Sequence, residues 1–336
     1  MAGCDRTAVT ERNFPAFGTD VRIEILDPER VQAAAAAADV ESRFRVAERD
    51  WYAFGTGELA RVNSLLAQGQ PAAISAELAP LITRAIELHA RSGGLFDPGV
   101  CALVRLWKFD SEAALATATG PPTAAEIRAL RARQGTLADA HFDGRTVSAK
   151  RPLCIDLGGM AKGTALEQAR LVLVRHGIRN ALVDIGGSSQ LAIGQKGARP
   201  WFIGLKDPRA YRVIGRLALE PGEAASTSGD YERGYTRDGH RYHHILDPRT
   251  GEPTMGSASV TVLAWDAELA DAAATALMVA GPTRFREVST ALGISAALLI
   301  TTTGQLLTTP GMAVRLRGDN DGRLPLDNAP GQGADL

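Results

Sequence analysis

Predicted strands follow one another directly in this chain, and this order most limits the folds that it can adopt. The segments 201–208 and 213–220 each read as a strand, and 294–309 reads as a strand hairpin. A parallel, doubly wound sheet needs a crossover, usually a helix, between its successive strands, so this order argues against one. We therefore expect an α+β fold, with mixed, largely antiparallel sheets flanked by helices.

Helical and turn patterns interrupt the strands at a few points. Helices are predicted over 29–50, 76–92 and 124–133, with an exposed loop over 111–125. Further strands are predicted over 14–26 (after a Gly-Thr turn), in a hairpin over 141–149, at the start of 154–178 and at the start of 180–194. The last two segments each continue into a glycine turn, and a helix follows the first of them.

No linker divides the 336 residues into two domains, and a chain of this length can bury a large core. We expect one domain over 13–316, a disordered N-terminus over 1–12 and a flexible tail over 317–336. The net charge of -1, with scattered lysines and arginines, does not favour nucleic acid as a partner. The three cysteines lie far apart without a CxxC motif, so neither a disulfide framework nor a zinc site is expected.

The N-terminal tripeptide Ala2-Gly3-Cys4 ends as a bacterial lipoprotein cleavage box does, although the sequence as written has no signal peptide before it. Two interpretations stay open. Cys4 is a lipid anchor that follows a trimmed signal, or the tripeptide is a chance match in a disordered start.

The segment 226–281 contains a polar loop with a histidine pair, an Asp-Pro turn, an apolar strand and an Ala-rich helix. Asp271 and Thr275 are four residues apart on that helix, so their side chains share one face. Carboxylate and hydroxyl oxygens suit a hard cation such as Mg²⁺. The alternative is that Asp271 complements the helix dipole and Thr275 is a small packing residue.

The segment 156–164, DLGGMAKGT, is not a P-loop, because its lysine precedes the last glycine. It still offers Asp156 at a strand end and Lys162 at a helix start, a possible cradle for phosphate; otherwise it is only a tight turn. Among the histidines, His243 and His244 point to opposite sides of an extended segment. We expect one of them to be a site residue.

Taken together, these segments resemble the ApbE family of FAD:protein FMN transferases in both order and spacing. The resemblance covers roughly residues 14–310. Its motifs are FGT (17–19), the aromatic segment ending in ELARVN (51–63), GGLFDPGVCALVRLW (93–107), DLGGMAKG (156–163), ALVDIGG (181–187), TSGDY (227–231), HHILDPRTG (243–251) and the strand and helix of 259–281.

The resemblance implies an Mg²⁺-dependent enzyme that transfers FMN from FAD to a threonine hydroxyl of a target protein through a phosphodiester bond, releasing AMP. The implied acceptor is a flavin-carrying subunit of a membrane redox complex. The implied location is the bacterial cell envelope, at the periplasmic face of the inner membrane, if a signal precedes this sequence. Without a signal, the protein is expected in the cytoplasm. The resemblance also favours the lipid anchor at Cys4.

The resemblance assigns roles to individual residues. Those implied to bind the metal are Asp271, Thr275 and the backbone carbonyl of Gly159. Those implied to contact FAD are Phe17, Phe54, Leu95, Phe96, Asp97, Asp156, Lys162 and Leu246. The flavin-stacking aromatic falls among Trp51, Tyr52 and Phe54. His244 is placed near the diphosphate, and Asp156, Asp271 or His244 would accept the proton, with His244 and Asp156 as the catalytic candidates.

Two positions depart from the family pattern. Ser188 and Ser189 follow the second glycine turn where an acidic or amide residue is usual, which leaves one polar contact open. Gly99 makes the flavin-binding turn DPGV, and a looser turn is expected there. Two other functions remain: a FAD diphosphatase, if water replaces the threonine, or a FAD-binding protein without chemistry.

Overall fold

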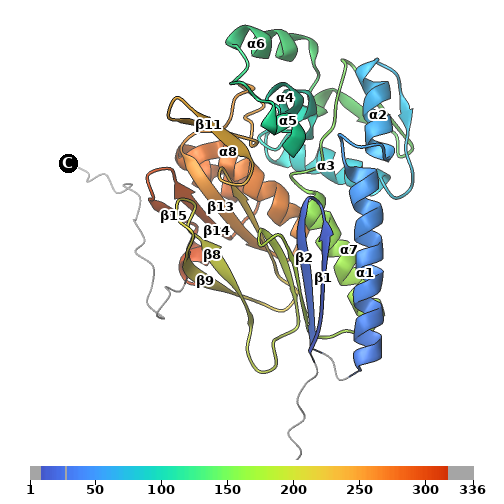
Figure 1. Ribbon diagram of the computed structural model, residues 1–336, viewed down its shortest axis with the longest axis vertical. Helices are drawn as coiled ribbons and strands as arrows, with labels where there is room; N and C mark the ends of the chain where they lie inside the picture. Colours follow the sequence, from blue (N-terminus) through green and yellow to red (C-terminus); the bar gives the residue numbers. More distant parts are fainter. Residues whose placement is uncertain (1–8, 27–28, 317–336) are drawn as a thin grey trace, which may run out of the picture.

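An antiparallel sheet of eight strands organises the protein (Figure 1). The computed structural model describes residues 9–26 and 29–316. In spatial order, the strands are β1 (Val9–Ala16), β2 (Thr19–Leu26), β6 (Ala181–Ile185), β7 (Ser189–Ile193), β10 (Ala224–Gly229), β13 (Ser257–Ala264), β14 (Ala296–Thr301) and β15 (Leu306–Thr308). Every neighbouring pair is antiparallel. The α+β prediction is therefore confirmed.

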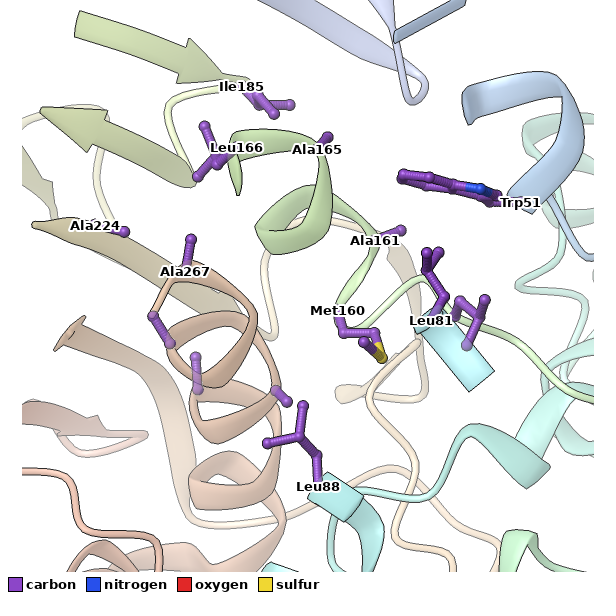
Figure 2. Packing of buried hydrophobic residues seen from close by; sticks show 14 of the residues in the cluster. Trp51, Leu81, Leu88, Met160, Ala161, Ala165, Leu166, Ile185, Ala224 and Ala267 are labelled. Carbon is purple, nitrogen blue, oxygen red and sulfur yellow. The ribbon is translucent and has the colours of Figure 1, made fainter. Parts of the chain in front are cut away.

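Helices cover one face of this sheet. The long ones are α1 (Arg30–Trp51), α7 (Ala161–Arg175) and α8 (Ala267–Ala291), and α2 (Glu58–Ala67) and α3 (Ala79–Arg91) lie beyond them. The core between the layers contains Leu166 of α7 next to Ile185 of β6, with Trp51 and Met160 at its other side (Figure 2). Gly163 lets α7 and α8 approach, because a Cβ at this position would lie 2.3 Å from the carbonyl oxygen of Ala267.

A two-stranded sheet, β8 (Trp201–Lys206) and β9 (Val213–Leu219), covers the opposite face. Alternate residues of β8 are buried, as a strand with one covered face requires. The other small sheets are β3 (Ala72–Ala73), β5 (Thr146–Ala149) and β4 (Ala140–Phe142), and the hairpin of β11 (Gly234–Arg237) and β12 (His240–His243). The hairpins predicted over 141–149 and 294–309 are thus confirmed.

The remaining short helices gather at the end of the molecule where the hairpin β11–β12 lies (Figure 1). They are α4 (Cys101–Leu106), α5 (Glu112–Ala116) and α6 (Ala124–Arg133), with 3-10 turns at Pro98–Val100 and Leu137–Asp139, while α9 (Pro310–Ala313) lies near β14. Trp107, Phe109 and Leu246 belong to the apolar cluster that joins α4 and α6 to the loop after β12.

Three secondary-structure predictions are wrong in part. β1 begins at Val9, so the last residues of the segment expected to be disordered form a strand, because they pair with β2. A short helix, α5, occupies part of the predicted loop 111–125, and Ser111 caps it by accepting the N–H of Ala114. The start of 154–178 forms no strand. Residues 1–8, including Cys4, and the predicted tail 317–336 lie outside the described residues.

The expectation that the cysteines form no disulfide is also wrong. Cys101 and Cys154 are bonded, with their Cα atoms 5.2 Å apart, although 53 positions separate them in sequence. The fold brings them together because the segment before Asp156 runs alongside the turn before α4, where the Asp156 N–H donates to the Pro98 carbonyl at 2.7 Å. Among the described helices, none is long and apolar enough to cross a membrane.

Candidate functional site

The first turn of α7 and the beginning of α8 meet at a buried carboxylate. Asp271 Oδ2 accepts the backbone N–H of Gly163 at 2.9 Å, and the side chain is almost fully buried. Burial raises the pKa of Asp271, while the nearby positive charge of Lys162 opposes the rise. Asp271 is therefore held rigidly by the backbone of the glycine turn that the sequence singled out.

The other two predicted metal-binding residues lie together. A Cβ at Gly159 would come within 3.3 Å of Thr275 Oγ1 and 3.1 Å of the Phe96 ring. Glycine at this position therefore lets the turn backbone approach the threonine hydroxyl closely. Thr275 Oγ1 also lies 3.2 Å from Ser228 Oγ, at the end of β10. The helix face that carries Asp271 and Thr275 thus meets the glycine turn.

Lys162 connects the two glycine turns. Its Nζ donates a 2.6 Å hydrogen bond to Ser188 Oγ, and the Ser188 carbonyl accepts the Thr227 N–H at 2.7 Å. Gly186 and Gly187 precede Ser188 with φ of 66° and 64°, which glycine adopts without the steric cost that other residues pay. The serine that departs from the family pattern therefore supplies a polar contact of its own.

Asp156 lies at the edge of the same site. Its Oδ1 accepts the Gly158 N–H at 2.9 Å. Burial raises the pKa of Asp156, and the Gly158 hydrogen bond and the charge of Arg233 oppose this. The carboxylate is consequently a stronger base than an ordinary aspartate.

Hydrogen bonds to side chains stabilise the Leu95-Phe96-Asp97 turn. Asp97 Oδ1 accepts the N–H groups of Gly99 at 2.7 Å and Leu137 at 3.0 Å. His89 Nδ1 lies 3.1 Å from the Phe96 carbonyl oxygen. Burial raises the pKa of Asp97, and the charge of His89 opposes the rise. The buried Asp97 carboxylate thus has a structural role in the turn, and the side chains of Leu95 and Phe96 are buried.

The sequence predicts a looser turn where Gly99 departs from the family pattern. The structure shows the opposite, because the backbone packs closely around Gly99. A Cβ at Gly99 would lie 2.8 Å from Asp97 Oδ1 and 2.8 Å from the Leu137 backbone nitrogen. The missing side chain lets the backbone around Leu137 close against the turn. The glycine is therefore part of a tight contact.

The aromatic candidates differ in exposure. Trp51 is buried in the core, whereas Tyr52 is 41% exposed and donates its hydroxyl to the Asp110 carbonyl at 2.7 Å. Burial is the main cause that raises the pKa of Tyr52, and the charges of Asp156 and Arg233 also act on it. Phe54 lies 5.6 Å from Tyr52, ring centre to ring centre, with the Arg105 guanidinium over its face. Tyr52 is therefore the aromatic near Asp156.

Phe17 and Leu246 both pack against apolar neighbours. Phe17 adopts a positive φ of 56° in the turn between β1 and β2, and its ring packs edge-on against Phe44 at 5.4 Å. Leu246 is buried in the apolar cluster beside α4 and α6. The FAD contacts expected of these two side chains remain predictions.

The two histidines of the pair have different surroundings. His243 is buried, and its Nε2 lies 3.0 Å from the Thr254 carbonyl oxygen. His244 donates its backbone N–H to the Arg233 carbonyl at 3.1 Å. Burial, with help from the charge of Arg233, lowers the pKa of His244 to about 3. The His244 ring is therefore neutral at physiological pH.

Sequence reasoning missed Arg233 and Ser228. The Arg233 guanidinium donates to the Phe109 carbonyl at 2.9 Å, and its charge acts on Asp156, His244 and Tyr52. Ser228 lies in the TSGDY motif and Arg233 follows it two residues later. The family resemblance assigns no role to the polar residues of this motif. Among the described residues, no cluster of three or more His, Cys, Asp or Glu side chains could hold a metal. Hydroxyl and backbone oxygens would have to contribute.

Comparisons with known proteins place the chain among one family. A model of the ApbE family matches residues 17–298. A Rhodobacter capsulatus protein named FAD:protein FMN transferase is 39% identical over 314 residues, which cover 92% of this chain and 58% of that protein. The protein of the same name from Vibrio cholerae is 32% identical, over 90% of this chain and 91% of its own length. The chain therefore spans less than two thirds of the first relative and most of the second.

Solved structures show the same fold. The crystal structure of the ApbE protein from Thermotoga maritima matches with a TM-score of 0.83 and 32% identity, over 92% of this chain and 99% of that one. The flavin transferase ApbE from Vibrio cholerae matches with a TM-score of 0.80 and 29% identity, over 92% of this chain and 99% of its own. The mixed architecture of helices and antiparallel sheet is thus shared with known structures.

Proposed function

This chain belongs to the ApbE family, and we propose that it transfers FMN from FAD to a threonine hydroxyl of an acceptor protein. In this reaction the threonine oxygen bonds to the FMN phosphorus, the bond from that phosphorus to the AMP moiety breaks, and AMP leaves. The observation that supports this most is the convergence of Lys162, Asp271 and Thr275 on one glycine turn.

The residues at this turn fit Mg²⁺. Asp271 contributes a buried carboxylate, Thr275 the hydroxyl of a half-buried residue, and Gly159 a backbone close to that hydroxyl. All of these are oxygen donors, which Mg²⁺ prefers. When bound there, Mg²⁺ would neutralise diphosphate charge and make AMP a better leaving group.

We assign substrate binding, proton transfer and hydrogen bonding to different side chains of this site. Lys162, fixed by Ser188, and Arg233, fixed by the Phe109 carbonyl, provide two positive charges for the anionic substrate. Asp156 would accept the threonine proton on Oδ2, because Gly158 engages Oδ1 and burial raises the carboxyl pKa. His244 is neutral and therefore a weak base, so we assign it a hydrogen-bonding role beside the diphosphate.

The acceptor we propose is a flavin-carrying subunit of a membrane redox complex. The relatives' name, FAD:protein FMN transferase, supports a protein acceptor, and the kind of complex follows from the family resemblance. With a lipid anchor at Cys4, the enzyme would work at the periplasmic face of the inner membrane. Cys4 itself lies outside the described residues.

Mass spectrometry of a threonine-containing flavin domain, incubated with this protein, FAD and Mg²⁺, tests the proposal. A mass gain of one FMN, lost with Asp271→Ala, supports transfer. Thr290→Val is the matched control, because Thr290 is exposed on α8 and bonds only its own helix backbone. Release of FMN and AMP without a mass gain would replace the transferase with a diphosphatase. Bound FAD without products would leave a binding protein.

A further inference from the structure

A disulfide joins two of the segments that form the proposed site. Cys101 and Cys154 are bonded, and both side chains are buried. Cys101 begins α4 directly after the turn Pro98–Val100, and Cys154 lies two residues before Asp156. The bond therefore connects the proposed FAD-binding turn to the segment of the proposed base.

From the disulfide, the two segments run side by side toward the site. The Asp156 N–H donates to the Pro98 carbonyl at 2.7 Å. Farther along, a Cβ at Gly159 would lie 3.1 Å from the Phe96 ring, so this ring packs against the glycine turn. The contacts follow one another as the residue numbers fall on one segment and rise on the other. The disulfide thus fixes one end of an antiparallel pair of segments whose other end is the proposed metal-binding turn.

The other hydrogen bonds of the second segment lead mainly to α2. The Asn63 amide donates to the Ile155 carbonyl at 2.7 Å and accepts the Ile155 N–H at 2.8 Å. The Leu153 N–H donates to the Leu66 carbonyl at 3.3 Å. Between residues 95–101 and 153–159, which all lie in the described part of the chain, the bond to the Pro98 carbonyl is the one hydrogen bond. The disulfide is therefore the strongest direct connection between the turn and the base.

Noncovalent contacts keep both segments in the fold without the disulfide. The Gly135 N–H donates to the Pro152 carbonyl at 2.7 Å, and the Leu137 N–H donates to Asp97 Oδ1 at 3.0 Å. Leu153 is fully buried in the core. We therefore expect the reduced chain to stay folded, with weaker control over how the turn and the base lie relative to each other.

We propose that this disulfide positions the site, so that the oxidised chain binds FAD and transfers FMN efficiently and the reduced chain does not. The inference rests on the proposed function and adds its redox control. The bond closes a loop across 53 positions and so restricts the motion of both segments. Misplacement of reacting groups by about 1 Å can lower a rate by about 100-fold. Cys101 and Cys154 are positioning residues, because they act through Phe96 and Asp156.

Thiol–disulfide exchange would form the bond. The thiols of Cys101 and Cys154 give two electrons and two protons to the disulfide of an oxidant, such as oxidised glutathione; the oxidant's S–S bond breaks as the protein's S–S bond forms. Disulfides persist in oxidising compartments and are rare where cellular reductants keep thiols reduced. The chain would therefore gain full activity in an oxidising compartment, consistent with the proposed periplasmic location.

Comparison of the oxidised and reduced chain tests this proposal. Alkylation in denaturant and mass spectrometry of the Cys4→Ser protein, treated with oxidised glutathione, should find no free thiol before reduction and two after it. Reduction should weaken FAD binding, measured by fluorescence quenching, by about threefold or more and lower the rate of FMN transfer to a flavin domain by about tenfold or more. Oxidised glutathione should restore both, while far-UV circular dichroism stays unchanged.

Cys101→Ala combined with Cys154→Ala is the matched control. This variant should behave as the reduced chain does, with or without reductant, and it decides the question if the buried bond resists reduction. A variant that is folded and as active as the oxidised chain would overturn the proposal.

Three further outcomes would also overturn it. Two free thiols before reduction would mean that no disulfide forms. Equal FAD binding and transfer in the oxidised and reduced chain would leave the bond a purely stabilising role, and unfolding on reduction would mean that it holds the whole fold. If the oxidised chain transferred no FMN while its FAD binding still responded to reduction, the proposed function would fail and the positioning role would stand.

Discussion

Lys162 Nζ and Ser188 Oγ lie 2.6 Å apart and join the start of α7 to the turn between β6 and β7. The two residues come from separate glycine turns, 26 positions apart in sequence. The contact fixes a long, flexible lysine side chain before substrate arrives, which lowers the entropy cost of placing its charge. A serine thus orients the cation of the site.

Ser188→Ala should weaken FAD binding by about three- to tenfold, because a hydrogen bond to a charged group is lost while the lysine charge remains. Lys162→Met should weaken it more, by about 100-fold. Ser189→Ala is the matched control, since the Ser189 hydroxyl is buried without a hydrogen-bond partner among the described residues. FAD titration by fluorescence quenching measures all three. Equal affinities of the Ser188 and Ser189 variants would contradict the orienting role.

The sequence predicts the type of sheet because helix and strand patterns arise from residues that are close together in the sequence. The Ala-rich run of α8 and the alternation in β8 each reflect one buried face, which periodicity reveals. The contact of Lys162 with Ser188 and the Cys101–Cys154 bond depend on how distant segments pack. No local pattern encodes such pairings. Arg233 was missed for the same reason, since its importance comes from its neighbours in space.

Gly99→Thr should destabilise the fold by about 1–3 kcal/mol, as overpacking of a close contact does. The new Cβ would strike the Asp97 carboxylate and the Leu137 backbone, which are hydrogen-bonded to each other and hold the Leu95-Phe96-Asp97 turn. Gly204→Ala is the control, because its Cβ would meet only Val213 methyl groups at 3.4 Å. Urea unfolding compares the variants. A Gly99→Thr protein as stable as the unchanged chain would mean that the turn accepts the usual family residue.

Stability should fall as the pH drops below about 6.5, with His244 as one cause. Its pKa is lowered from 6.5 to about 3 in the folded state, so between these values the unfolded chain binds the extra proton. The neutral ring therefore contributes stability fully above pH 6.5, and this is lost as the pH falls toward 3. Because His244 is only partly buried, we expect roughly 2–3 kcal/mol from it.

The measurement is the free energy of unfolding from pH 4 to 8, for the unchanged chain and for His244→Gln. The glutamine variant should show a flatter dependence on pH, because it lacks the titrating ring. His240→Gln is the control, since His240 is exposed on the hairpin β11–β12 and should leave the slope unchanged. Identical slopes for the unchanged chain and the His244 variant would show that the ring is not held neutral by the fold.

Thr275→Val should raise the Mg²⁺ concentration needed for half-maximal transfer by about tenfold or more, while the protein stays folded. Valine keeps the shape of threonine on α8 but removes the hydroxyl that faces the Gly159 turn, leaving a cation with one oxygen donor fewer. Asp271→Asn should have a larger effect, because it removes the carboxylate charge although its oxygen can still accept the Gly163 N–H. Magnesium titrations of the transfer rate, together with calorimetry of Mg²⁺ binding to the protein alone, separate a metal effect from a general loss of activity.

Both variants could instead lose activity while the Mg²⁺ concentration for half-maximal transfer stays unchanged. The metal would then have to bind elsewhere, and Asp271 would have only its structural hydrogen bond to α7.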